Sequence, residues 1–228
     1  MTEDWPARVQ RGLDATRARI ATACARAQRD PASVRLIAVS KRQPPEAIAA
    51  AYALGQRDFG ENYVQELATK LAALGELAGA RFRLIGHLQK NKAKDAAKLG
   101  CSVDTIDSFE LADVLARRAE LAGQQLEVLI EVNIDAEPQK GGVLVRDAAA
   151  LADHVRSLKA LRLEGLLCIP RPSDVPEQAR ASFAALRELG ARLGTRELSM
   201  GMSDDLEVAV EEGATMVRIG TALFGPRG

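Results

Sequence analysis

The sequence predicts a single-domain (β/α)8 barrel (a TIM barrel) with an extra helix in front of it, and three observations support this. Short apolar runs alternate with amphipathic segments along most of the 228 residues. Eight such runs, each followed by a helical segment, match the element count of the (β/α)8 fold. The units repeat roughly every 25 residues, a spacing that suits a barrel without a second domain. An open, doubly wound sheet would give a similar alternation.

The chain opens with a long amphipathic segment, which we predict to be a helix over residues 3–29. Apolar residues recur in it at helical spacing: Val9, Leu13, Ile20, Cys24 and Ala27. Pro6 suits the first turn of a helix. We therefore expect one domain over residues 1–228, made of an N-terminal helix (1–30) and the barrel (34–228).

The eight predicted strands are short, largely apolar runs, as expected for parallel strands buried on both faces. They cover residues 34–40, 57–60, 81–86, 102–106, 126–134, 161–168, 196–200 and 214–219. The predicted helices lie between them, at 44–55, 62–77, 89–99, 108–123, 146–158, 175–194 and 203–213. A last short helix is expected after Gly220. The polar, glycine-bearing loop 135–143 is the best candidate for a mobile lid.

The composition argues against several classes of protein. Lys+Arg and Asp+Glu both number 31, so the formal net charge is zero, which argues against broad attraction to nucleic acid or to anionic membranes. No apolar stretch approaches the length of a membrane span, and the polar start of the chain is no secretory signal. Three widely spaced cysteines suit a reducing cytoplasm, and with only two histidines a metal site is not expected. We expect a cytoplasmic monomer.

Lys41 is the first candidate for chemistry. It follows the apolar run 36–39 after a single small residue, Ser40, at the carboxyl end of the first predicted strand. This is where α/β folds place their sites, and partial desolvation there would lower the pKa of the lysine and make its amine a Schiff-base nucleophile. Taken locally, the plainer interpretation is a solvated lysine at a strand end.

The eighth predicted strand ends in a pattern that suits phosphate. Gly220 and Thr221 open a short helix, where backbone N–H groups and the helix terminus favour an anion. Ser199 and Ser203 follow the seventh strand, and barrels often bind phosphate at the loops after strands seven and eight. Arg218 lies two residues before Gly220 and so shares its face. Together with the lysine of the first strand, this pattern predicts a phosphorylated carbonyl compound held as a Schiff base.

Asn62 and His87 follow the second and third predicted strands on the same rim. Either residue could instead cap the next helix or bond a turn, so both carry weaker signals.

Five blocks of this sequence together resemble the pyridoxal phosphate homeostasis protein family. The blocks are AVSK (38–41), FGENYVQE (59–66), IGHLQKNK (85–92), VNIDAEPQKGGV (132–143) and LSMGMSDDLEVAVEEGATMVRIGTALFG (198–225). The family has the barrel of the amino-terminal domain of alanine racemase, known as PLP fold type III, and it binds pyridoxal 5′-phosphate (PLP). The resemblance implies the same fold and the same cofactor here.

The resemblance also implies roles for the candidate residues. Lys41 would hold PLP as a Schiff base, and Arg218 would face the pyridine nitrogen. Asn62 and His87 would belong to the rim on the cofactor side. The phosphate would be surrounded by Ser199, Ser203, Gly220 and Thr221.

An arginine at the ring nitrogen disfavours its protonation and so weakens PLP as an electron sink. The chain ends three residues after its Leu-Phe-Gly, so we expect no second domain of the kind that supplies a tyrosine base in alanine racemase. The sequence therefore predicts a non-catalytic protein of PLP (vitamin B6) homeostasis, with PLP-dependent apo-enzymes as candidate partners. Two alternatives stay open: a PLP-dependent enzyme with weak amino-acid racemase activity, and a Schiff-base aldolase acting on sugar phosphates.

Overall fold

The computed structural model of the protein describes residues 4–225 and shows a closed barrel of parallel strands. The barrel strands are β1 (Arg35–Val39), β2 (Asp58–Glu61), β3 (Arg81–Leu84), β4 (Ser102–Ile106), β5 (Leu126–Asn133), β7 (Leu161–Leu167), β8 (Glu197–Ser199) and β9 (Met216–Ile219). Each pairs in parallel with the next in this order, and β9 pairs with β1. The predicted (β/α)8 barrel is therefore confirmed, and an open sheet is excluded. Residues 1–3 and 226–228 of the predicted domain lie outside the described residues.

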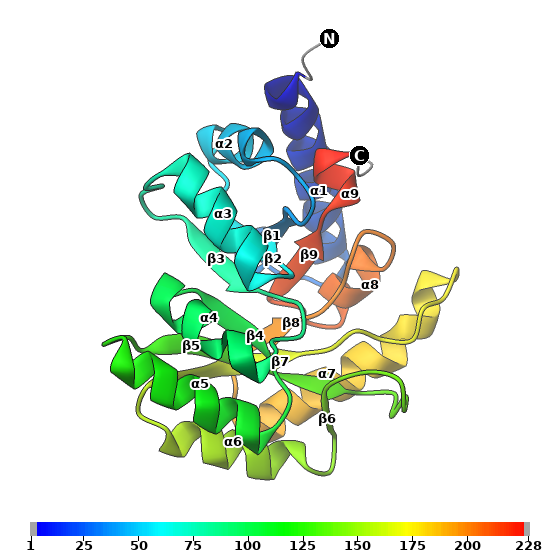
Figure 1. Cartoon of the computed structure of the whole chain (residues 1–228). Helices are drawn as coiled ribbons and strands as arrows, with labels where there is room; N and C mark the ends of the chain where they lie inside the picture. The colour runs from blue at the N-terminus through cyan, green and yellow to red at the C-terminus, as the bar shows by residue number, and fades with distance from the viewer. Residues whose placement is uncertain (1–3, 226–228) are drawn as a thin grey trace.

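Helices alternate with these strands and surround them (Figure 1). They are α1 (Trp5–Arg26), α2 (Pro45–Ala53), α3 (Val64–Leu74), α4 (Ala93–Leu99), α5 (Phe109–Leu121), α6 (Ala148–Ser157), α7 (Arg180–Leu193), α8 (Leu206–Glu211) and α9 (Thr221–Phe224). Short 3-10 turns, η1 (Pro31–Ser33), η2 (Lys90–Lys92) and η3 (Pro176–Ala179), precede β1, α4 and α7. The predicted helices are all present and differ from the observed ones only at their ends.

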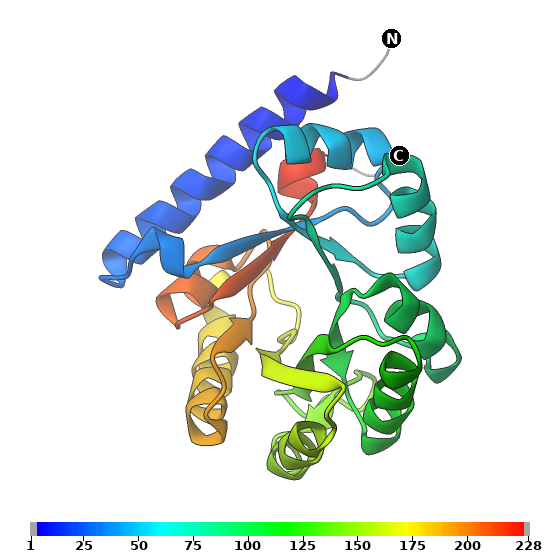
Figure 2. The same ribbon diagram turned by 90° about the vertical axis from the view of Figure 1, so that its left-hand side faces the viewer.

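Helix α1 lies outside the ring formed by the other helices (Figure 2). Its first turn is capped by the Asp4 side chain, which accepts a hydrogen bond from the Ala7 N–H at 3.2 Å. The helix packs against α2, α8 and α9. Gly12 permits the contact with α9, because a Cβ at this position would lie only 2.7 Å from the Leu223 Cα. Helix α1 is thereby held against the two helices that follow the last two strands.

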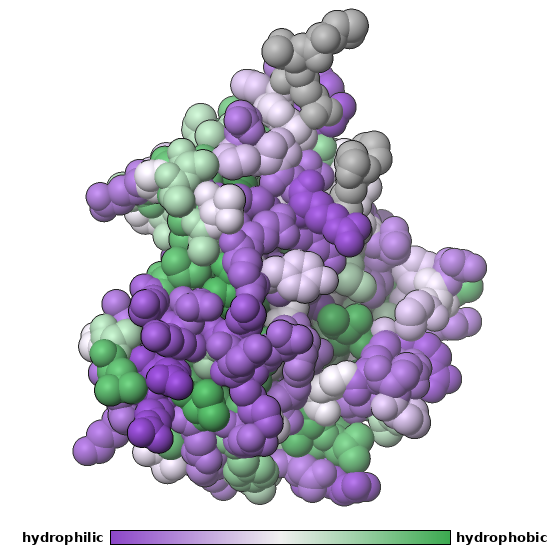
Figure 3. All heavy atoms as spheres, in the orientation of Figure 1, coloured by the Kyte–Doolittle hydropathy of each residue, from purple (hydrophilic) through white to green (hydrophobic). Residues whose placement is uncertain are grey.

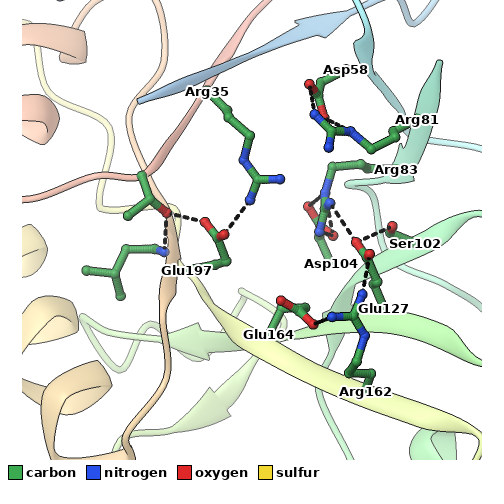
Figure 4. A network of polar contacts seen from close by, with 12 residues as sticks. Arg35, Asp58, Arg81, Arg83, Ser102, Asp104, Glu127, Arg162, Glu164 and Glu197 are labelled. Carbon is green, nitrogen blue, oxygen red and sulfur yellow. Dashed lines mark hydrogen bonds and ion pairs between the residues drawn. The ribbon is translucent and has the colours of Figure 1, made fainter. Parts of the chain in front are cut away.

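Ion pairs fill the amino-terminal end of the barrel interior (Figure 4). Their centre is the pair of Arg83 and Asp104, both fully buried, with Arg83 Nε 2.8 Å from Asp104 Oδ2. The pairs around it are Arg35 with Glu197, Arg81 with Asp58, and Arg162 with both Glu127 and Glu164. We call these residues the charged layer. It closes the end of the barrel opposite to the one where the strands finish.

Strand β1 connects the charged layer to the other end of the barrel. Since side chains alternate along a strand, Arg35, Ile37 and Val39 share one face, and Lys41 follows in the turn after the strand. Arg35 belongs to the charged layer, Ile37 is fully buried, and both Val39 and Lys41 line a cleft. The inner face of one strand thus runs from an ion pair through an apolar layer to the candidate nucleophile.

One strand was not predicted. After β5, the short strand β6 (Val143–Leu144) pairs with the last residues of β5 in parallel and lies outside the barrel order. It anchors the far end of the loop that we expect to act as a lid. At the near end, Asn133 holds Glu137 by two hydrogen bonds, Nδ2 to the Glu137 carbonyl at 2.8 Å and the Glu137 N–H to Oδ1 at 2.9 Å. The loop is tied at both ends, and its mobility stays a prediction.

The face of the molecule in Figure 3 is mostly hydrophilic, with apolar side chains gathered in small groups. Among residues 4–225, no helix combines the length and the apolar character needed to cross a membrane.

Candidate functional site

A cleft of about 690 Å³ opens at the carboxyl ends of the barrel strands, which is a volume typical of small-ligand sites. Six of the eight predicted site residues line it: Lys41, Asn62, Ser203, Arg218, Gly220 and Thr221. Residues that the sequence analysis did not single out complete the wall: Arg19, Val39, Ile85, Ile169, Met202, Asp204 and Ala222. We call it the barrel-end cleft.

Arg218, on β9, presents a buried positive charge to this cleft. Its Nη1 donates to the Ser199 carbonyl at 2.6 Å, and its Nη2 donates to the Cys168 carbonyl at 2.9 Å. Within residues 4–225 no carboxylate forms an ion pair with it, and burial lowers the pKa of Arg218 below its usual range. The guanidinium is thus fixed by neutral acceptors, and a ligand ring nitrogen placed against it would be disfavoured from taking up a second positive charge.

Ser199 does not line the cleft, although the sequence predicted that it would lie beside a phosphate. It is fully buried at the end of β8, and its hydroxyl accepts a hydrogen bond from Arg218 Nη1 at 2.9 Å. The chain reaches the cleft only after it has turned at Gly201, where φ is +92°. Ser203, beyond that turn, lines the cleft, so Ser199 supports the arginine instead of facing a ligand.

Lys41 lies at the end of β1 in a tight turn, half-buried in the wall of the cleft. The turn is closed by a hydrogen bond from the Gln43 N–H to the Ser40 carbonyl at 2.9 Å. Arg42 adopts the left-handed region with φ +58°, which is uncommon for a residue with a side chain. The strand therefore stops abruptly and leaves the lysine at its tip.

The other end of the cleft is formed where β9 runs into α9. Thr221 and Ala222 begin this helix, and the N–H groups of a first helical turn have no acceptor within the helix. Gly220 brings this backbone close to β1, since a Cβ there would meet the Val39 carbonyl oxygen at 3.3 Å. With the Ser203 backbone and hydroxyl close by, this end of the cleft offers hydrogen-bond donors suited to an anion.

Arg19 is a cleft residue that the sequence analysis missed. It comes from α1, and its guanidinium bonds both Glu207 oxygens, with Nε to Oε1 at 2.6 Å and Nη2 to Oε2 at 2.7 Å. The same Nη2 donates to the Ser203 carbonyl at 2.8 Å. Arg19 thus ties the outer helix to the loop at the donor-rich end of the cleft. No sequence signal points to it, because Arg19 lies in the helix that precedes the barrel and not at the end of a strand.

Asn62 lines the barrel-end cleft, whereas His87 does not. His87 is exposed and lines a neighbouring pocket of about 300 Å³ that shares Asn62. Its Nδ1 lies 3.3 Å from Asp107 Oδ2. Gly86 permits the close approach of the Asn62 backbone, because a Cβ on this glycine would lie 2.6 Å from the Asn62 carbonyl oxygen. The structure thus places His87 on the same rim but in a separate hollow.

The cysteines are buried, and the acidic residues of 4–225 do not gather into a metal site. All three cysteines are buried and free, and burial raises the pKa of Cys101 and of Cys168 to about 12. In the part of the chain that the structure describes, no group of three or more His, Cys, Asp or Glu side chains could hold a metal ion.

Residues 12–228 match the family model described as the N-terminal domain of alanine racemase. A protein of Pseudomonas aeruginosa named pyridoxal phosphate homeostasis protein is 46% identical over 212 residues, which cover 92% of each chain. The protein of the same name from Escherichia coli K12 is 42% identical and covers 96% of this chain and 97% of its own. The structure of PipY from Synechococcus elongatus with PLP bound superposes with a TM-score of 0.80 at 38% identity, over 92% of this chain and 99% of PipY.

Proposed function

This chain belongs to the alanine racemase N-terminal domain family and, within it, to the pyridoxal phosphate homeostasis proteins, and from this premise we propose that it binds PLP in the barrel-end cleft. Lys41 holds the cofactor as a Schiff base, formed when its amine condenses with the PLP aldehyde and releases water. The proposal rests on one observation: the Lys41 amine, the buried Arg218 guanidinium and the anion-binding end at Gly220 all line the same cleft.

The cleft residues suit the three parts of PLP. Lys41 supplies the amine for the aldehyde, and Arg218 supplies the group opposite the pyridine nitrogen. Ser203, with the backbone of Gly220 and Thr221, supplies donors for the phosphate. Ser199 does not face the ligand and instead holds Arg218 by a hydrogen bond. Asn62 and His87 belong to the rim, and His87 lines the neighbouring pocket instead of the cleft.

We propose that the protein carries PLP and does not turn over substrates. PLP supplies an electron sink only to the extent that its ring nitrogen is protonated, and the charge of Arg218 opposes this protonation. The two tyrosines, which could serve as bases, lie elsewhere: Tyr52 donates to the Ala78 carbonyl, and Tyr63 lines the neighbouring pocket. These features support a carrier of PLP over a catalyst, and we propose that it acts in the cytoplasm as a monomer and delivers PLP to apo-enzymes.

The proposal is tested by adding PLP to the purified protein and recording the visible spectrum, followed by borohydride reduction and peptide mass spectrometry. We expect a new absorption band and the mass of reduced PLP on the peptide that contains Lys41. Incubation of the loaded protein with amino acids in heavy water then tests for catalysis. Exchange of the α-proton at enzymatic rates would overturn the carrier role in favour of the racemase alternative, and a sugar-phosphate mass on Lys41 in the protein as isolated would favour the aldolase.

Replacing Arg19 by methionine is expected to weaken the binding of PLP more than that of pyridoxal, which lacks the phosphate. The hydrogen bond from Arg19 to the Ser203 carbonyl holds the donor-rich loop, and the loss of such a charged, part-exposed bond costs about 1 kcal/mol, or about fivefold in affinity. Titration of both ligands measures the difference. Arg26→Met is the control, since this residue of the same helix is 63% exposed and pairs with Glu211 away from the cleft. Equal losses for the two ligands would contradict the prediction.

A further inference from the structure

Behind the turn that carries Lys41, between strands β1 and β2 and helix α3, lies a cluster of buried polar side chains. It consists of Ser40, Glu61, Glu66 and Lys70, and we call it the Lys70 cluster. Ser40 and Glu61 are fully buried, and the Lys70 side chain is 6% exposed. None of these residues lines the barrel-end cleft, and the sequence predicted a functional role for none of them.

Lys70 is the hub of the cluster. Its ammonium donates to the Ser40 carbonyl at 2.6 Å, to Glu61 Oε1 at 2.6 Å and to Glu66 Oε1 at 2.7 Å. Three acceptors match the three protons of an ammonium group, so its donor capacity is filled. Glu66 and Lys70 are four residues apart on α3 and therefore share one face of this helix.

The cluster holds the chain on both sides of Lys41. Before the lysine, the Ser40 hydroxyl donates to Glu61 Oε1 at 2.7 Å, and the Ser40 carbonyl accepts from Lys70. After it, the Arg42 N–H donates to Glu66 Oε1. The left-handed conformation of Arg42 is thus stabilised by a side chain from α3. Lys41 is the single residue between the two fixed points.

Stability alone does not account for such a cluster. Two carboxylates face one ammonium, and the second oxygen of Glu61 is buried without a hydrogen-bond partner. Burial raises the pKa of Glu61, against the opposing effect of its bonds to Lys70 and Ser40. A buried ion pair with an unsatisfied polar atom often stabilises the fold no more than well-packed apolar residues of similar volume would. What this arrangement does provide is a defined geometry for the turn.

We propose that Glu61, Lys70 and Glu66 are positioning residues, which fix the turn 40–42 so that the Lys41 amine points into the cleft in a reactive orientation. This inference rests on the proposed PLP binding and adds residues that would not touch the cofactor. A displacement of about 1 Å at a reacting atom can cost up to 100-fold in rate. Loosening the turn should therefore change the reactivity of Lys41 far more than it changes the rest of the barrel.

The test compares Glu61→Gln and Lys70→Met with a matched control, a residue of β8 that pairs with the first residue of β1. Glu197→Gln removes a carboxylate that pairs with Arg35 at 2.6 Å, at the opposite end of β1. Two quantities are measured: the PLP dissociation rate, and the pH-dependent labelling of Lys41 by acetic anhydride in the PLP-free protein, normalised to Lys92. In both cluster variants we expect dissociation about tenfold faster and a more than threefold change in relative Lys41 labelling. The Glu197 variant should stay within twofold of the unmodified chain in both measurements.

Thermal unfolding of each variant separates positioning from general destabilisation. The proposal is overturned if Lys41 labelling is unchanged in the cluster variants, or if all variants lose PLP in proportion to their loss of stability. If Lys70→Met does not fold, the same two measurements on Glu61→Gln and Glu66→Gln test the proposal. Glu66→Gln is the milder change because the Glu66 side chain is 23% exposed. If the unmodified protein fails to bind PLP, the proposed function fails, while the labelling of PLP-free protein still decides whether the cluster positions Lys41.

Discussion

Replacement of Lys41 by alanine is expected to abolish the visible absorption band of the PLP-loaded protein and to weaken PLP binding by on the order of 100-fold. The physical reason is the loss of the covalent bond, which no hydrogen bond in the cleft can replace. The proposed contacts at Arg218, Ser203 and Thr221, which line the cleft, would remain, so weak binding without the covalent bond should persist. Spectral titration and peptide mapping after borohydride reduction measure the two effects.

Lys92→Ala is the matched control for this experiment. Lys92 lines the neighbouring pocket and is therefore a second lysine close to the rim, outside the barrel-end cleft. We expect this variant to keep both the absorption band and the adduct on Lys41. The assignment of Lys41 would be wrong if the adduct in the unmodified protein mapped to another lysine, or if Lys41→Ala kept the spectrum and the affinity.

Replacement of Asp104 by alanine is expected to destabilise the fold by about 3–5 kcal/mol. The change leaves Arg83 buried, charged and without its closest partner, because Arg83 Nη2 and Nε bond the two oxygens of Asp104 at 2.8 Å each. The next carboxylate, on Glu127, lies 3.6 Å from Arg83 Nη1. Urea unfolding followed by circular dichroism measures the loss as a lower midpoint.

Arg81→Ala provides the control for the charged layer. Its ion pair with Asp58 is 2.7 Å long, close to the 2.8 Å of the Arg83–Asp104 pair, but the Arg81 side chain is 51% exposed. Because the Asp58 side chain is only 10% exposed and loses its partner, this variant should lose about 1 kcal/mol, still well below the loss expected for Asp104→Ala. A double variant, Arg83→Met with Asp104→Leu, should recover much of the stability because no charge remains unpaired. A loss below about 1 kcal/mol for Asp104→Ala would contradict the prediction.

The sequence was sufficient to predict most of the barrel and much of the cleft. The parallel strands of a barrel are buried on both faces, so runs such as 36–39 and 126–134 are visible as apolar stretches between polar ones. The rule that sites lie at the carboxyl ends of strands then selected Lys41, Arg218 and Gly220, and the structure brings all three to one cleft.

The rest depends on side-chain direction and on contacts between distant segments. Ser199 and Ser203 look alike in the sequence, yet only the second lies beyond the turn at Gly201 and reaches the cleft. Arg19 comes from a helix outside the repeat, and Lys70 sits on a helix face that a periodicity argument assigns to the apolar core. Such residues are identified only once their partners are known.

The charged layer has a consequence for how the cofactor would travel. With Arg83 and Asp104 fully buried at one end of the barrel, PLP bound as we propose would enter and leave through the cleft at the other end. Uptake and release then follow the same path in opposite directions. A macromolecule that covered the opening without contacting PLP would slow both rates by the same factor and leave the dissociation constant unchanged. An apo-enzyme that receives PLP directly must instead bind at the opening of the cleft. Free PLP and the recipient enzyme would then compete for the same opening.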